Sequence, residues 1–340
     1  MTTIKDIARL SGYSIGTVSR VINHRQDVSE EARQIIEKVI EEENFQPNSN
    51  AKMLKQTITS NIAVLVKGTQ NVFLEGILER IQEYLRTFGE YVSVSFLDEF
   101  TNEVETAAQI CSERNPKGII FLGGNLHFFE EGFSRITVPS VLVTETAAGL
   151  GFDNLSSFTT DDSEAAGMAV DYLIRRGHTH IGIIGGSASG EKGEVGTRRL
   201  QGAVKRLKES GIPFDQDKQF CSCRFAMKDG YDAAVRMLKK DQEITGIFAL
   251  SDTVAVGVLR ALRDRDIRIP EDISLIGYDG IEHVKYTIPR LATVKQDRDA
   301  LAKKAVDDLL LRINYSRSAV HGTVPFRVLA GESIADLNKH

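Results

Sequence analysis

The chain has 340 residues, of which 41% are hydrophobic and 26% are charged, so it is long enough for two or three compact domains with ordinary cores. No apolar run approaches the roughly 18 residues of a membrane span, and the N-terminus lacks a basic region followed by an apolar stretch, so we expect a cytoplasmic protein with no signal peptide and no membrane contact. The net charge of −5 argues against a protein that coats nucleic acid regardless of its sequence.

The first sixty residues predict helices and no strand. Thr3 and Asp6 have the spacing of a capping box and open a first helix, and a second helix starts almost at once at Ser14. Ser29 is expected to cap a third helix. Its apolar side is predicted to face inward through Ala32, Ile35, Ile36, Val39 and Ile40. Two helices joined by a few residues and supported by a third are typical of a helix-turn-helix unit.

The second helix, "SIGTVSRVIN", has an outer side that is small and carries a single charge, on Arg20. Val18, Val21 and Ile22 repeat at helical spacing and are expected to pack inward. Small residues let a helix approach another surface closely, and an arginine there binds carboxylate, phosphate or a base edge. A helical bundle without a partner would gain nothing from such a side, so the segment favours a sequence-specific DNA reader.

Pro47 closes this unit, which we place at residues 1–47, and a polar segment at 48–60 follows. The segment is either a linker or a short helix on which Ala51, Leu54 and Lys55 share one side. Because it is too short and polar to be stable alone, such a helix would form only when another surface receives Leu54.

From residue 61 onward, apolar strand-like runs alternate with amphipathic helices, which indicates an α/β fold of doubly wound parallel sheets covered on both faces. About 280 residues of this pattern suit two lobes, an N-lobe at about 61–160 and 295–322 and a C-lobe at about 161–294 and 323–340. Ligands of such folds bind beyond the carboxyl ends of the strands, here in the cleft between the lobes. The strand-like runs are "IAVLV", "VSVSF", "GIIFL", "SVLV", "IGIIG", "GIFAL", "SLIG" and "LATV".

Motifs for catalysis and metal binding are incomplete. The stretch "GGSASGEKG" falls short of a phosphate-binding loop, because Glu191 separates Gly190 from Lys192 and a glycine stands where the hydroxyl is needed. His178 and His180 have no third ligand nearby, and no nucleophile elbow is present. We therefore expect no enzymatic activity, no cofactor and no metal.

Three distant stretches, "TIKDIARLSGYSIGTVSRVIN", "FQPNSNAKMLK" and "GYDGIEHVKYTIPRLATVKQD", together resemble the LacI/GalR family of bacterial transcription regulators. The resemblance covers essentially the whole chain in the family's order. It implies a homodimer, sometimes a tetramer, whose paired N-terminal domains bind a near-palindromic double-stranded operator. It also implies a core similar to periplasmic sugar-binding proteins, with a small effector in the cleft.

The resemblance assigns DNA contacts to the N-terminal unit and the segment after it. Gly16 departs from the family's usual residue with a side chain, so fewer bases would be specified there. Leu54 would be the wedge that unstacks the central base step from the minor groove, and Lys55 would lie beside it. The base-reading set is Ile15, Gly16 and Arg20, the phosphate-contacting set is Thr3, Ser14, Thr17 and Asn23, and the hinge-helix set is Ala51, Leu54 and Lys55.

The resemblance also assigns effector contacts. Arg199 and Asp279 match the family's charged contacts, while Phe73 and Phe225 match its aromatic ones. Taken singly, these residues also suit ordinary structural roles, on a helix surface, in a turn or in the core. Thr144 stands where many sugar-responsive members carry an acid. The polar positions are completed by Asn71, Ser251 and Gln296.

The leading hypothesis is a repressor of carbohydrate-related genes whose DNA affinity is set by a sugar-like ligand in the cleft. A second hypothesis keeps the DNA-binding unit but takes a phosphorylated carrier protein as the effector. A third, a solute-binding transport component or a doubly wound enzyme, lacks a signal sequence and a catalytic site. The sequence leaves open whether the effector releases DNA or promotes binding.

Overall fold

The computed structural model describes residues 4–22, 28–43, 61–69, 71–186 and 195–339. The chain divides into two compact units, Met1–Thr59 and Ser60–His340. Within the described residues, every helix is too short or too polar to cross a bilayer.

The described residues of the first unit form α1 (Ile4–Ser11), α2 (Ile15–Ile22) and α3 (Glu30–Glu42), the three helices that the sequence predicted. The Ser29 hydroxyl accepts a hydrogen bond from the amide of Ala32 and caps α3. The core of the unit is formed by Ile7, Ala8, Val18, Val21 and Ile36.

The predicted inward position of Ile35 is wrong. Its side chain is 39% exposed, whereas Ile36 is fully buried. Ala32 and Ile36 are four residues apart and share the buried face of α3, and Val39 and Ile40 pack partly against the same core. Ile35 lies roughly 100° around the helix from Ile36, which turns it toward solvent.

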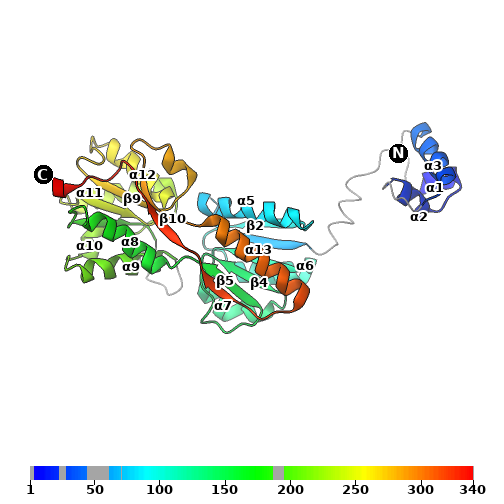
Figure 1. Cartoon of the computed structure of the whole chain (residues 1–340), viewed down its shortest axis with the longest axis horizontal. Coiled ribbons are helices and arrows are strands. Elements are labelled where there is room, and N and C mark those ends of the chain that lie inside the picture. Colours follow the sequence, from blue (N-terminus) through cyan, green and yellow to red (C-terminus); the bar gives the residue numbers. More distant parts are fainter. Residues whose placement is uncertain (1–3, 23–27, 44–60, 70, 187–194, 340) are drawn as a thin grey trace. The chain divides into compact units, whose positions relative to one another are not determined.

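The N-lobe is a six-stranded parallel sheet in the order β11-β5-β4-β3-β1-β2. Helices α5 (Val72–Thr87) and α13 (Arg298–Tyr315) pack together against one face of this sheet, and α6 (Glu103–Arg114) and α7 (Leu126–Gly132) cover the other (Figure 1). The strands are β1 (Ile62–Lys67), β2 (Val92–Leu97), β3 (Gly118–Leu122), β4 (Ser140–Val143), β5 (Leu155–Thr159) and β11 (His321–Thr323), and a 3-10 turn spans Phe133–Arg135.

Alternate residues of a central strand enter the two layers. Val64 of β1 packs in the cluster that contains Ile77 of α5 and Leu301 of α13. Leu65, the next residue, packs with Val104 of α6 and Phe129 of α7. Because successive side chains of a strand point to opposite faces, a continuous apolar run such as "IAVLV" serves both layers at once.

The C-lobe is a second six-stranded sheet in the order β12-β10-β9-β8-β6-β7. Helices α8 (Asp162–Ile174) and α9 (Val195–Glu209) form one packed pair, and α11 (Met227–Lys240) and α12 (Asp252–Arg263) form another. The strands are β6 (Ile181–Ile184), β7 (Phe220–Cys221), β8 (Gly246–Ala249), β9 (Ser274–Asp279), β10 (Ala292–Gln296) and β12 (Phe326–Leu329), and the short helices are α10 (Gln216–Gln219), Glu282–Lys285 and Leu337–Lys339.

The predicted doubly wound α/β architecture is confirmed, with one difference at the edge of the C-lobe. Strand β12 pairs antiparallel with β10, so this sheet is mixed rather than wholly parallel. The described chain passes between the lobes after β5, after β10 and after β11, which places the lobes side by side in Figure 1.

Strand β5 was absent from the predicted runs because its buried residues include two serines. The hydroxyl of Ser156 accepts hydrogen bonds from Arg312 and from the amide of Val320. The hydroxyl of Ser157 lies 2.8 Å from Nδ1 of His321. These partners compensate the burial of polar groups, so the strand needs no apolar run to be buried.

Candidate functional site

The outer side of α2 has the properties expected of a recognition surface. Ile15 is 47% exposed, and Gly16 and Arg20 are exposed as well. Val18 and Val21, on the opposite side, are buried in the core of the unit. The helix therefore presents one apolar side chain, one bare backbone position and one guanidinium on its outer side.

Ser14 and Thr17 are engaged with each other at the start of α2. The Ser14 hydroxyl accepts a hydrogen bond from the amide of Thr17 at 3.1 Å, and the two hydroxyl oxygens lie 2.9 Å apart. Ser14 is exposed, and Thr17 is half-buried. Their position at the N-terminus of α2 is one where phosphates bind to helices. The remaining predicted DNA contacts lie outside the described residues: Thr3, Asn23, Ala51, Leu54 and Lys55.

A cavity of about 260 Å³ lies between the two lobes, beyond the carboxyl ends of their parallel strands. Five of the seven predicted effector residues line it: Asn71, Phe73, Arg199, Phe225 and Asp279. They come from α5, α9, the segment after β7 and the end of β9, so residues more than 200 positions apart meet at one site. We call this space the inner cavity.

A buried charge network holds Arg199 in the wall of the inner cavity. Its Nε donates to Asp162 at 2.7 Å, its Nη1 donates to the carbonyl of Leu250 at 2.7 Å, and the same Nη1 lies 3.4 Å from Asp279. Burial alone would lower the pKa of Arg199, but the charges of Asp162 and Asp279 outweigh it and raise that pKa. The guanidinium also lies over the ring of Tyr278, 3.9 Å from its centroid. Arg199 is therefore a fixed cation and not the surface residue that its helix position alone would suggest.

Asp279 is shaped by burial and by its neighbours. Burial raises its pKa to about 6, while the charge of Arg199 and a 2.9 Å hydrogen bond from Gln296 pull in the opposite direction. Its φ of 112° is unusual for a residue with a side chain. Thr144, in the N-lobe wall of the same cavity, has a φ of 78°. Strained backbone of this kind costs on the order of 1–3 kcal/mol and concentrates at functional sites.

Asn71 and Phe73 begin α5. The carboxamide oxygen of Asn71 accepts hydrogen bonds from the amides of Phe73 and Leu74, both at 3.2 Å, and so caps the helix. Phe73 is 3% exposed, so its ring belongs to the core as well as to the cavity wall. Both residues thus have structural roles beside the predicted ones.

Ser251 and Gln296 do not line the inner cavity. The Ser251 hydroxyl accepts from the amide of Val254 and caps α12. Gln296 donates to Asp279 from the end of β10. Among the described residues, Gln296 therefore reaches the site through Asp279, and Ser251 holds the start of a helix.

Several wall residues were missed by the sequence analysis. Lys67 ends β1 and forms an ion pair with buried Glu103. Glu99 and Phe100 follow β2, and Arg224 follows β7. All lie at the end of a strand or within three residues after it, at the edge where ligands of parallel sheets bind, so strand ends alone would have indicated them. The other missed wall residues are Leu74, Gly123, Gly124, Asn125, Gly186, Val195, Gly196 and Cys223.

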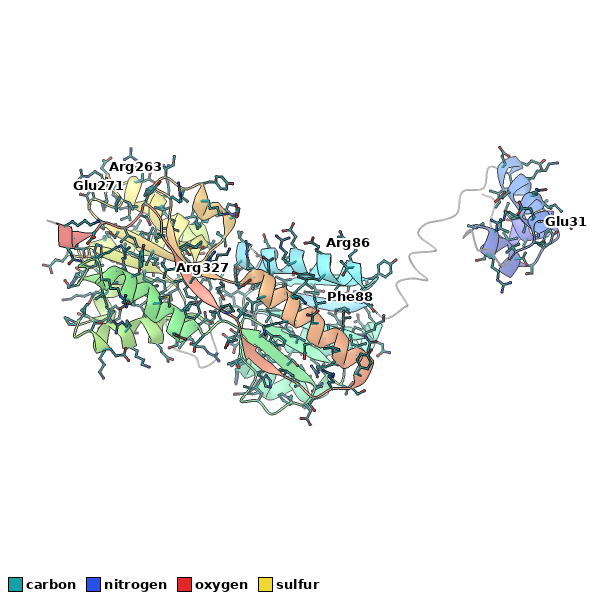
Figure 2. All side chains as sticks on the ribbon, in the orientation of Figure 1. Glu31, Arg86, Phe88, Arg263, Glu271 and Arg327 are labelled. Atoms are coloured by element: carbon teal, nitrogen blue, oxygen red, sulfur yellow. The ribbon has the colours of Figure 1, made fainter. Side chains whose placement is uncertain are left out.

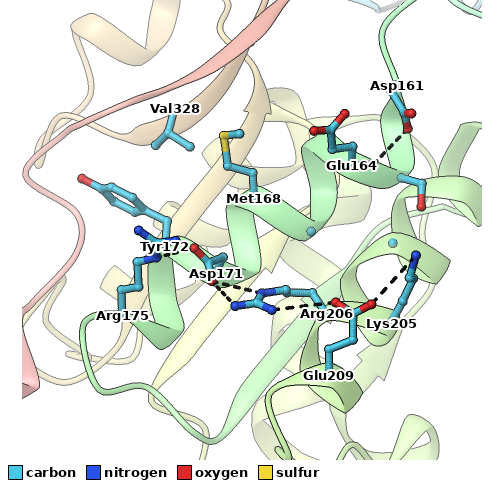
Figure 3. A pocket seen from close by; sticks show the side chains of 13 residues that line it. Asp161, Glu164, Met168, Asp171, Tyr172, Arg175, Lys205, Arg206, Glu209 and Val328 are labelled. Carbon is cyan, nitrogen blue, oxygen red and sulfur yellow. Dashed lines mark hydrogen bonds and ion pairs between the residues drawn. The ribbon is translucent and has the colours of Figure 1, made fainter.

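A second hollow, of about 890 Å³, lies on the C-lobe between α8 and α9 and is shown in Figure 3. Its charged side chains largely neutralise one another. Arg206 binds Asp171 at 2.5 and 3.0 Å and Arg175 binds the same carboxylate, while Lys205 lies 3.9 Å from Glu209. No predicted site residue lines this hollow in the described structure, so the cleft is the better candidate.

The histidines that the sequence analysis weighed as metal ligands have other partners. The ring of His178 is buried, with Nδ1 3.1 Å from the hydroxyl of Thr245 and Nε2 3.3 Å from the carbonyl of Ala335. His180 lies 2.7 Å from Asp241. Across the described residues, no three His, Cys, Asp or Glu side chains are grouped to hold a metal ion.

Comparison with known proteins agrees with this geometry. Residues 3–48 match the family described as bacterial regulatory proteins, lacI family, and residues 170–334 match a periplasmic binding protein-like domain. The HTH-type transcriptional regulator MalR of Clostridium butyricum is 38% identical over 89% of this chain and 90% of its own. The ribose operon repressor of Haemophilus influenzae is 31% identical over 92% of both chains.

Among solved structures, the lac repressor dimer bound to operator and the anti-inducer ONPF has the same fold. It has a TM-score of 0.75 at 23% identity and covers 98% of this chain and 99% of its own. With a relative at 38% identity over nine-tenths of the chain and a matching N-terminal domain, the resemblance seen in the sequence is confirmed: the chain belongs to the lacI family of bacterial regulatory proteins.

Proposed function

We propose that this protein is a sequence-specific DNA-binding repressor of carbohydrate-related genes, and that a sugar-like effector in the inner cavity controls its affinity for DNA. The observation that carries the proposal is the convergence of Arg199, Asp279 and two phenylalanines from distant parts of the chain on one interlobe cavity. Family members are transcription regulators and not enzymes. The name of the ribose operon repressor supports a carbohydrate.

Recognition of DNA would fall to the outer side of α2. Arg20 has the length and donor geometry for a bidentate contact with guanine, and Ile15 suits the methyl group of thymine. The absent side chain of Gly16 would let the backbone of α2 approach the groove closely. Ser14 and Thr17, at the N-terminus of α2, would contact phosphates.

The charges of the inner cavity favour a neutral ligand. Lys67 is paired with Glu103, and Arg199 is shared by Asp162 and Asp279. Because each of these cations already has an acid beside it, a phosphate or carboxylate would have to displace an existing partner. Hydroxyl groups can donate to Asp279 and accept from Arg199 without that loss, and aromatic rings suit the apolar face of a sugar.

A homodimer would bring two α2 helices to the two halves of a palindromic operator. Three exposed apolar side chains on the N-lobe support this assembly. Phe88 at the end of α5, labelled in Figure 2, is 60% exposed, Tyr91 is 70% exposed, and Phe96 of the edge strand β2 is 52% exposed. All three belong to residues 88–96, and a partner subunit would cover them in a dimer.

The test begins with the full-length protein and a pool of random duplex DNA. Binding selection should yield a near-palindromic sequence. The dissociation constant for that duplex, measured by fluorescence anisotropy, should change by about fivefold or more when the effector is present, as couplings of roughly 1–3 kcal/mol require. Candidate effectors would be tested one at a time, and they would include neutral sugars, sugar phosphates and sugar acids.

The matched variants are Arg20→Ala in α2 and Lys38→Ala in α3, whose side chain is 75% exposed. Arg20→Ala should weaken specific binding by about 1–3 kcal/mol and relax the base preference at one position of each half-site. Lys38→Ala should leave the selected sequence unchanged. Selection of no sequence, or an identical effect of both variants, would contradict the proposed recognition surface.

A further inference from the structure

A second cavity adjoins the inner one and is also lined by residues of both lobes. It has a volume of about 400 Å³ and shares five wall residues with the inner cavity. Its own walls are Gly68, Thr69 and Asp98 from the N-lobe and Ala226, Lys228 and Asp229 from the C-lobe. We call this space the outer cavity.

The side chain of Arg224 lies between the two lobes where the two cavities adjoin. Arg224 lines both of them and is 54% exposed. It comes from the C-lobe, but its guanidinium lies 4.4 Å from the centroid of Phe100 and 3.8 Å from Glu99, both in the N-lobe. Exposed contacts of this kind are weak, so a ligand can displace Arg224 and remain continuous from one cavity to the other.

The volumes of the two spaces suggest the size of the ligand. Drug-sized ligands occupy pockets of roughly 300–1,000 Å³, and the inner cavity, at about 260 Å³, lies below that range. It suits one sugar ring, which Arg199, Asp279 and the ring of Phe225 would contact. The outer cavity has space for more, and its side chains have the chemistry of a second ring.

The walls of the outer cavity are hydrophilic and of mixed charge. Asp98, Glu99 and Asp229 offer acceptors, and Lys228 and Arg224 offer donors. Phe225 is common to both cavities and supplies an apolar surface at their boundary. Mixed donors and acceptors beside one aromatic ring fit the hydroxyl groups and the apolar face of a sugar ring, and not a lipid or an extended apolar group.

We infer that the effector is a disaccharide or a comparable glycoside, with one ring in the inner cavity and the other in the outer cavity, and with Arg224 between them. This inference rests on the proposed function, because it concerns the size of the same ligand. It also adds a new site. Of the seven effector residues predicted from the sequence, two, Asn71 and Phe225, line the outer cavity.

The test compares sugars of two sizes on the full-length protein. Isothermal titration calorimetry would use glucose, galactose and fructose, and then maltose, cellobiose, trehalose, sucrose and lactose. At least one disaccharide should bind tenfold or more tightly than either of its own monosaccharides. The decisive variant is Ala226→Phe, which fills the outer cavity from the C-lobe wall. It should weaken disaccharide binding at least tenfold.

Thr69→Phe fills the same cavity from the opposite lobe and should have the same effect, which guards against a folding defect in one variant. Lys239→Phe, at an exposed position near the end of α11, is the matched control and should bind every sugar as the unaltered protein does. A monosaccharide that binds as tightly as any disaccharide would overturn the inference and leave the proposed function standing. Disaccharide binding that is unaffected by both filling variants would do the same. Binding of no carbohydrate at all would overturn the proposed function and this inference with it.

Discussion

The carboxylate of Glu145 and the guanidinium of Arg198 face each other across the boundary between the lobes, with Oε2 and Nη2 3.2 Å apart. Glu145 follows β4 of the N-lobe and is 1% exposed, whereas Arg198 lies in α9 of the C-lobe. Within the described part of the chain, neither oxygen of Glu145 accepts a well-formed hydrogen bond. Burial raises the pKa of Glu145 to about 8, although the charge of Arg198 acts to lower it.

This arrangement predicts a pH dependence of stability. The ordinary pKa of a glutamate is about 4.3, so between about pH 4.5 and pH 8 the unfolded chain is ionised at this position while the folded protein retains the proton. The contribution of Glu145 to stability is therefore fully present below its pKa in the unfolded chain. It is lost as pH rises through its pKa in the folded protein, by up to about 1.4 kcal/mol per pH unit. The free energy of unfolding should be measured with denaturant for Glu145→Gln and for the unaltered protein. The stability of the variant relative to the unaltered protein should rise progressively from pH 5 to pH 8.

Glu105→Gln is the control for that comparison, because Glu105 is an exposed acid of α6 in the same lobe. The difference between this variant and the unaltered protein should stay constant over the same pH range. If Glu145→Gln behaves in the same way, the carboxyl group is hydrated in the folded protein and the lobes do not enclose it.

The packing of α8 against α9 depends on a glycine. A Cβ atom at Gly202 of α9 would collide with the backbone of Ser163 in α8. Because backbone cannot yield as a flexible side chain does, we expect Gly202→Ala to lower the free energy of unfolding by about 1–3 kcal/mol. Thermal unfolding should be compared with Gly149→Ala, since a Cβ at Gly149 would meet nothing within 4 Å. Equal melting temperatures for the two variants would show that the helices can separate without loss.

Much of this architecture could be predicted from the sequence, and the exceptions have physical reasons. Apolar runs such as "IAVLV" predicted the central strands, because strands buried on both faces need them. Strand β5 was missed, since Ser156 and Ser157 are buried with hydrogen-bond partners that are distant in the sequence. The pairing of Glu145 with Arg198 was equally out of reach, because it depends on how the lobes meet.

The candidate site was predictable to a similar degree. Family resemblance brought Arg199 and Asp279 together, and the structure adds that they share one buried network. It did not indicate Arg224 and Phe100, whose importance arises only from the distance between two loops of different lobes. Gln296 was predicted to contact the ligand, and in the structure its hydrogen bond goes to Asp279.

Replacement of Arg199 should affect stability as well as the effector response. Arg199→Met leaves Asp162 and Asp279 buried without their shared cation, and loss of one partner of a buried ion pair costs about 3–5 kcal/mol. Because Arg199 acts to lower the pKa of Asp279, its removal raises that pKa further, so the deficit should be smaller at pH 5 than at pH 8. Urea unfolding at both values measures it.

Arg80→Met is the matched control for Arg199→Met. Arg80 also binds two acids, Glu83 and Asp299, but its side chain is 46% exposed. Its replacement should lower the free energy of unfolding far less than Arg199→Met does, at either pH. The double variant Arg199→Met with Asp162→Asn should recover part of the loss. Without this comparison, a missing effector response in the single variant could not be assigned to the cavity.

A substitution at Gly16 can test the DNA-binding role of α2 without disturbing its folding. Among the described residues, a Cβ atom at Gly16 would meet only the Ser14 hydroxyl, at an ordinary 3.6 Å, so a side chain fits there. Gly16→Gln should leave α2 at least as stable as it is now, because glycine is the less favourable of the two residues in a helix. On the proposed recognition surface, however, the new carboxamide would reach base edges and favour adenine at its position. Selection from random duplex DNA should therefore yield a changed base at one position of each half-site, while Gly149→Gln selects the original sequence. An unchanged selected sequence from a stable Gly16→Gln protein would mean that this side of α2 does not enter the groove.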